Sequence, residues 1–179
     1  MDKKMTGPSS FDPFWDIAEE LIGKTCWSAL HVAGSIVDLD FGGRVPLHDP
    51  IVNPRKLRPD QAQFRGEINL ELGDAPWILL DARGRIADSD DAPKQIESSI
   101  RCLEGKRVIG LGRSVSQYTD TLLWFSSGLV VEFEGRVLLA MDLFGELEEG
   151  DEAVSIRDKG RSVAVAVQGG ALRCRVGAV

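Results

Sequence analysis

The sequence predicts an α+β fold made of two helix-plus-antiparallel-meander units that form a pseudo-repeat, followed by a β-rich C-terminal tail. Apolar residues recur at helical spacing in two places, and short apolar runs bounded by turn residues follow each place. The order of these features is the same both times, as expected of an internal repeat. The alternative is chance similarity between two segments that each contain a helix and several strands.

The first unit begins with a helix. Asp12 and Pro13 form an N-cap and first-turn pair, and the apolar stripe that follows runs to about Ile22. Gly23 and Lys24 end this helix. Strands are then expected at residues 25–32, 36–41, 67–72 and 77–80, and Trp27 is expected to face the core.

The second unit repeats this order. Ile96, Ile100 and Leu103 make one stripe of a helix, and Gly105 stands where a left-handed residue would end it. Strands are expected to follow at residues 107–111, 121–125, 129–133 and 136–141.

We expect one folded domain flanked by two different ends. Residues 1–10 are polar and are predicted to be disordered. Residues 11–150 form the single α+β domain, with its similar halves at 11–91 and 92–150. Residues 151–179 contain three strand-like runs separated by turns, and we expect this β segment to pack on the domain.

The overall composition limits the class of protein. The 179 residues include 21 basic and 28 acidic side chains, for a net charge of −7, which argues against nucleic-acid binding because phosphate contacts need a basic face. Three widely spaced cysteines suggest reduced thiols, and no apolar run approaches the ~20 residues that span a bilayer. We therefore predict a cytoplasmic protein, monomeric or homodimeric, that does not contact membranes.

Residues 44–65 break the regular pattern. This stretch holds four of the eight prolines and a local excess of basic residues in an acidic chain. Prolines favour irregular backbone, and long loops on a regular scaffold often carry function. We expect the stretch to be exposed, dispensable for folding and needed to bind a partner through Arg44, His48, Asp49, Arg55, Lys56, Arg58 and Arg65. The alternative is a mobile insertion without a function.

Two short motifs look like parts of nucleotide-binding loops, but the secondary structure expected around them does not fit such loops. Gly23, Lys24 and Thr25 look like the end of a phosphate-binding loop, but they end a helix, whereas a phosphate cradle begins one. The glycines at 110 and 112 follow a strand without the third glycine or the helix that the dinucleotide motif needs. We therefore predict no cofactor.

Catalytic and metal-binding patterns are equally sparse. Only two histidines occur, and His48 with Asp49 is the one plausible acid–base pair. No Gly-x-Ser-x-Gly motif supplies a nucleophile. The acidic run at residues 88–91 lacks the glycine and the closing glutamate of a calcium loop. We therefore predict neither a catalytic residue nor a metal site.

The order of motifs resembles a group of small uncharacterised bacterial proteins that includes immunity proteins of polymorphic toxin systems. The resemblance covers about residues 14–141 and depends on structural motifs at 21–24, 41–43, Trp77, 86–91, 103–106 and 121–128. The insertion at 44–64 and the tail after 150 depart from the pattern. The resemblance implies a non-catalytic protein that binds another protein, such as a toxin domain.

Two functional hypotheses remain open. The first is a protein-binding module, with an immunity-like inhibitor as its narrower form, and a neighbouring toxin gene would favour it. The second is a small hydrolase-like enzyme that uses His48 and Asp49, which a bound metal or a cleft around His48 would favour. We prefer the first hypothesis because the catalytic constellation is missing from the sequence.

Overall fold

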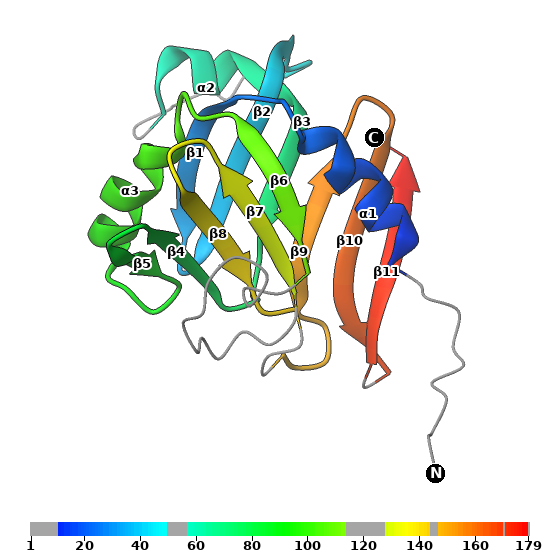
Figure 1. Ribbon diagram of the computed structural model, residues 1–179. Helices are drawn as coiled ribbons and strands as arrows, with labels where there is room; N and C mark the ends of the chain where they lie inside the picture. Colours follow the sequence, from blue (N-terminus) through cyan, green and yellow to red (C-terminus); the bar gives the residue numbers. More distant parts are fainter. Residues whose placement is uncertain (1–10, 50–56, 114–127, 144–146, 170, 179) are drawn as a thin grey trace.

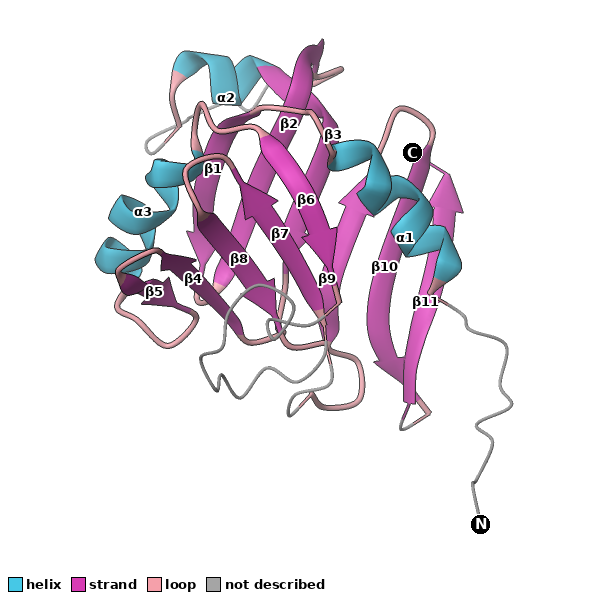
Figure 2. Ribbon diagram, in the orientation of Figure 1, coloured by secondary structure: helices cyan, strands magenta, loops and turns pink. Residues whose placement is uncertain are grey.

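The computed structural model describes residues 11–49, 57–113, 128–143, 147–169 and 171–178. Within them, most of the ordered backbone is β-strand, and the strands form two antiparallel sheets (Figures 1 and 2). The predicted disordered segment 1–10 and the predicted strand 121–125 lie outside the described residues.

The larger sheet has six strands. In spatial order they are β1 (Cys26–Ala33), β2 (Ile36–Pro46), β3 (Phe64–Leu72), β9 (Glu152–Arg157), β10 (Arg161–Gln168) and β11 (Ala171–Ala178). The smaller sheet has five strands. Their spatial order is β5 (Gly84–Asp88), β4 (Trp77–Asp81), β8 (Val137–Met141), β7 (Leu129–Phe133) and β6 (Val108–Gly112).

The prediction of two helix–meander units in an α+β fold is wrong. Strands from different predicted halves pair with each other. In the smaller sheet, for example, β4 from the first half pairs with β8 from the second half. The C-terminal strands also join the larger sheet, where β9 pairs with β3. The chain is therefore mostly β, and its strands are grouped by long-range hydrogen bonding and not by sequence halves.

In the described ranges, three short α-helices accompany the sheets: α1 (Asp12–Ala18), α2 (Pro59–Gln63) and α3 (Pro93–Ile100). Helix α1 lies on the same side of the larger sheet as the smaller sheet, over strands β10 and β11 (Figure 1). Phe14 and Ile17 of α1 are fully buried in the core. Among the described residues, no helix combines the length and the apolar composition needed to cross a bilayer.

Two glycines end helical segments and let the sheets meet at one edge. Single 3₁₀ turns (Glu19–Leu21 and Arg101–Leu103) extend α1 and α3, and Gly23 and Gly105 follow with φ of 85° and 82°. This confirms the left-handed conformation predicted for Gly105. The residues that follow these two glycines are hydrogen-bonded to each other, with an isolated antiparallel bridge between Thr25 and Arg107.

The core lies between the two sheets. Phe41 of β2 and Phe133 of β7 stack across it with ring centroids 6.2 Å apart. Trp77 is fully buried, and its indole N–H donates to the carbonyl oxygen of Ser35 at 2.8 Å. Burial of each large ring stabilises the fold, because the stabilisation grows with the apolar area removed from water.

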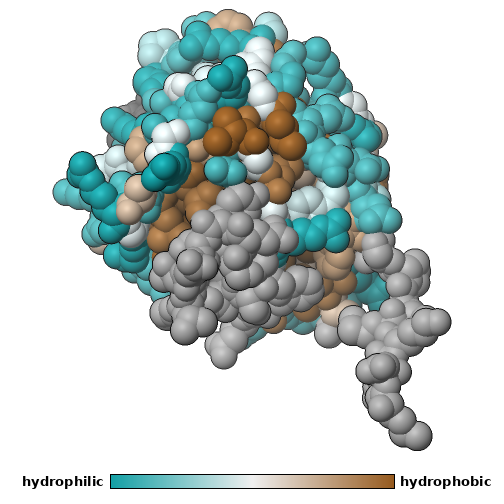
Figure 3. Space-filling view, viewed as in Figure 1, coloured by the Kyte–Doolittle hydropathy of each residue, from teal (hydrophilic) through white to brown (hydrophobic). Residues whose placement is uncertain are grey.

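The outer faces of the two sheets differ in polarity. The smaller sheet carries a second apolar cluster on its outer face, formed by Ile78, Leu80, Val130 and Ala140. These four residues are themselves buried. Figure 3 views the molecule from this side and shows further apolar residues at the surface among hydrophilic ones. The larger sheet is different, because its outer face carries polar and charged residues at successive alternating positions.

Candidate functional site

The segment 44–65 is not one loop, because it includes the end of β2, helix α2 and the start of β3. Its dispensability for folding stays a prediction. Arg44 and Pro46 belong to β2, and Arg65 belongs to β3, where it pairs with Val45. Pro46 is tolerated because this end of β2 extends beyond the described pairing with β1. Helix α2 also buries Ala62, so part of the segment contributes to the folded core.

The predicted site residues separate into three groups. Arg55 and Lys56 lie outside the described residues. Arg44 and Arg58 meet at one surface, and Arg65 instead approaches the acidic residues of β2. His48 and Asp49 follow β2 and lie in solvent.

Arg44 and Arg58 meet at Trp27. The Arg44 guanidinium lies 4.9 Å from the ring centroid of Trp27 and pairs with Asp60 at 3.1 Å. Arg58 donates to the Trp27 carbonyl oxygen at 3.3 Å and to Glu104 at 2.6 Å. We call the surface formed by Trp27, Arg44 and Arg58 the Trp27 platform.

The platform differs from the core position expected for Trp27. A β-bulge between Cys26 and Ser28 leaves Trp27 unpaired with β2, which removes it from the regular core alternation. Its indole Nε1 is buried and has no hydrogen-bond partner within the described part of the chain. The Arg44 and Arg58 side chains remain 51% and 44% exposed.

Acidic residues hold the platform arginines in place. The hydrogen bond that Arg58 donates to Glu104 is the main cause that raises the pKa of Arg58. Asp60 contacts both arginines, at 3.1 Å and 3.3 Å. Gln61 of α2 donates to the Ser28 hydroxyl at 2.9 Å, which attaches the helix to the sheet beside the platform. The platform is therefore preorganised by contacts from separate segments.

His48 and Asp49 form the only predicted acid–base pair. Nδ1 of His48 lies 3.3 Å from Oδ2 of Asp49, and the two side chains are 99% and 95% exposed. A pair in this position is surrounded by water, so it has no desolvated environment in which to strengthen an interaction with a substrate.

The outer face of the larger sheet is a second candidate surface, which the sequence reasoning missed. Strand register places two rows of outward side chains across all six strands. One row is Ser28, Asp40, Asn69, Arg157, Ser162 and Gly177, and the next is Leu30, Asp38, Glu71, Ser155, Ala164 and Arg175. The alternation of Asp38 and Asp40 with apolar neighbours in β2 is the signal that predicts this face.

The β2–β3 end of this face is acidic and partly buried. Asp40 is only 9% exposed and accepts hydrogen bonds from the Gly66 N–H at 2.8 Å and from the Asn69 amide at 3.1 Å. The same Asn69 amide donates to Asp38. Burial is the main cause that raises the pKa of Asp40 to about 6, and burial also raises the pKa of Asp38.

With a pKa of about 6, the Asp40 carboxyl group can bind or release a proton just below neutral pH. Burial also raises the pKa of Glu71, which pairs with Arg157 at 3.6 Å. In the described ranges, no group of three or more histidine, cysteine or acidic side chains is arranged to hold a metal ion. The arrangement is a polar surface that carries charges of both signs.

Comparison with known proteins finds no match among family models, curated proteins or solved structures. The resemblance to immunity proteins therefore stays a prediction.

Proposed function

We propose that this chain is a non-catalytic protein-binding module that contacts its partner through the Trp27 platform. The single observation that carries the proposal is the stacking of an exposed arginine on a tryptophan at the surface, 4.9 Å from its ring centroid. Tryptophan and arginine are strongly enriched among the residues that dominate the energy of protein interfaces.

Preorganisation supports the same conclusion. Arg58 is held by Glu104 and Asp60 before any partner arrives. Binding therefore orders fewer side chains, which lowers the entropy cost of forming an interface. The exposed guanidinium of Arg44 still has donors for a partner, because its hydrogen bond to Asp60 uses only Nη2.

An inhibitor that binds a toxin domain, as the resemblance implies, is the narrower form of this proposal. A cytoplasmic location belongs to it as well, because Cys26, Cys102 and Cys174 are free thiols, which suit a reducing compartment. We do not propose the hydrolase alternative, because His48 and Asp49 lie in solvent.

The test compares Arg44→Ala with Arg83→Ala, which removes an equally positive side chain from the exposed turn between β4 and β5. Tagged wild-type protein captures partners from an extract of the native host, and the partner is then purified and its Kd measured. We expect Arg44→Ala to weaken binding about tenfold or more, and Arg83→Ala to leave it unchanged.

The result that contradicts the proposal is equally specific. A partner that binds wild type, Arg44→Ala and Arg83→Ala with the same Kd would place the binding surface elsewhere. Circular dichroism of each variant confirms that a loss of affinity does not come from unfolding.

A further inference from the structure

A hollow lies at the β9–β11 end of the outer face of the larger sheet. The two rows of outward residues place small side chains side by side here, at Ser162 and Gly177 in one row and at Ser155 and Ala164 in the next. Small residues on three adjacent strands leave space above the sheet. The resulting pocket has a volume of about 420 Å³, which is within the range of small-molecule sites.

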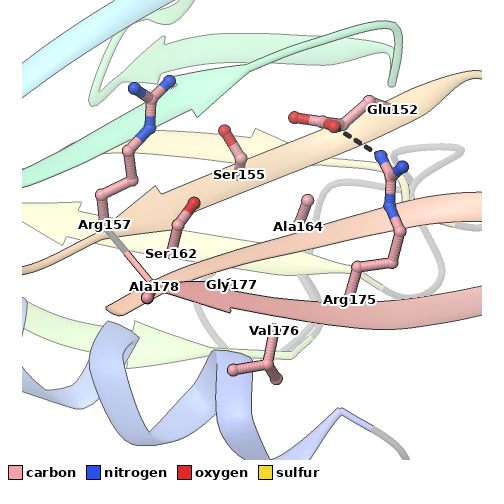
Figure 4. A pocket seen from close by; sticks show the side chains of 9 residues that line it. All are labelled: Glu152, Ser155, Arg157, Ser162, Ala164, Arg175, Val176, Gly177 and Ala178. Atoms are coloured by element: carbon pink, nitrogen blue, oxygen red, sulfur yellow. Dashed lines mark hydrogen bonds and ion pairs between the residues drawn. The ribbon is translucent and has the colours of Figure 1, made fainter. Parts of the chain in front are cut away.

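Two arginines flank this pocket. Figure 4 shows Arg157 at one end and Arg175 at the other, with the hydroxyl groups of Ser155 and Ser162 on the same side of the sheet. Glu152 contacts Arg175 at 2.8 Å, and Glu71 lies 3.6 Å from Arg157. The charge of Asp38 also acts on Arg157. Each guanidinium has five N–H donors, so these carboxylates leave donors available.

Ser155 gives an independent sign of a ligand. Its side chain lines the pocket and is only 4% exposed, yet its hydroxyl oxygen has no hydrogen-bond partner among the residues that the structure describes. A buried hydroxyl without a partner is costly, and such groups are rare in folded proteins. A bound molecule with an acceptor would satisfy this donor.

We propose that the pocket binds a small molecule through an oxyanionic group, a carboxylate or a phosphate, with Arg157 and Ser155 as the principal ligands and Arg175 at the opposite wall. Guanidinium groups and hydroxyls donate to oxyanions, and the planar arginine fork fits two oxygens at once. The pocket lies on β9–β11, apart from the Trp27 platform on β1 and β2, so this inference does not rest on the proposed function.

The test is an NMR titration of isotope-labelled full-length protein with two probes, sodium phosphate and sodium succinate, at one pH and one ionic strength. We expect saturable shifts of amide signals from the pocket strands with at least one probe. Phosphate alone would identify a phosphate site, and succinate alone would identify a carboxylate site.

Three variants then locate the ligands. Arg157→Gln is expected to raise the Kd about tenfold or more, and the charge-matched control Arg83→Gln is expected to leave it unchanged. Ser155→Ala is expected to raise the Kd several-fold. Without a probe, this same variant should keep or raise the melting temperature, because it removes a buried hydroxyl that has no hydrogen-bond partner in the described part of the chain.

Two results would overturn the proposal. One is the absence of saturable shifts on the pocket strands with either probe up to about 20 mM. That concentration would detect even a Kd of a few millimolar, which is weak binding. The other is equal weakening by Arg157→Gln and Arg83→Gln, which would show only a nonspecific effect of charge. A lower melting temperature for Ser155→Ala would show that its hydroxyl has an internal partner and would remove the second line of support.

Discussion

Replacing Asp40 by asparagine should stabilise the protein at high pH and have little effect at low pH. Asp40 lies under the outer face of the larger sheet, where burial raises its pKa from 3.8 to about 6. The nearby charge of Asp38 also raises this pKa, whereas the Gly66 N–H and Arg65 lower it. An asparagine keeps an oxygen acceptor for Gly66 and Asn69 and carries no charge.

The magnitude follows from the pKa difference. A raised pKa means that ionisation costs the folded state more than the unfolded state, so stability present below pH 3.8 is lost as the pH rises through about 6. At about 1.4 kcal/mol per pKa unit, the full loss is about 3 kcal/mol. The stability gained by Asp40→Asn should therefore grow from under about 1 kcal/mol at pH 4 to about 3 kcal/mol at pH 8.

The assay is urea unfolding of wild type and variant at several pH values between 4 and 8. Comparing the two proteins at each pH cancels the titration of groups that the substitution does not affect. Asp90→Asn, in the exposed turn before α3, is the matched control and should show no comparable rise. A difference between wild type and Asp40→Asn that is constant with pH, or a variant that is less stable at pH 8, would refute the reasoning.

Two further predictions test the packing. Gly66→Ala should destabilise the protein by about 1–3 kcal/mol in urea unfolding, because a Cβ there would lie 2.5 Å from the Phe41 nitrogen. The control Gly160→Ala has open space around its Cβ and should change the free energy of unfolding by no more than about 0.5 kcal/mol. Equal destabilisation by the two variants would contradict the close approach of β2 and β3. Burial is also the main cause that raises the pKa of the Cys26 thiol. At pH 8, a thiol reagent should therefore label Cys26 after Cys102 and Cys174 in the folded protein. In denaturant, it should label all three cysteines readily. Peptide mass spectrometry measures this order, and early labelling of Cys26 would show that β1 opens in the native state.

Local features were largely predictable from the sequence. Gly105 follows a helical segment and has a positive φ, because glycine takes this conformation without steric cost. The apolar runs 129–133 and 136–141 correspond to β7 and β8 within one residue at each end. These features depend on neighbours a few positions apart, so the order of residues along the chain carries the signal.

The sequence predicted some residues of the candidate surfaces but not the contacts between them. The excess of basic residues pointed to Arg44 and Arg58, but the tryptophan on which Arg44 stacks and the glutamate that holds Arg58 come from distant segments. Arg58 and Glu104, for example, are 46 positions apart. Sequence patterns do not show which distant side chains converge, because convergence depends on how the strands pair.

The sequence by itself therefore determined the position of most strands, such as β7 and β8, and the glycines that end the helical segments. It also contains the alternation of polar and apolar residues along β2. Only the tertiary structure decided that the strands divide into two sheets, and that Asp40, Asn69 and Arg157 line up across adjacent strands. The physical reason is that alternation along a strand is a local property, whereas partner choice and register come from hydrogen bonds and core packing between segments far apart in the chain.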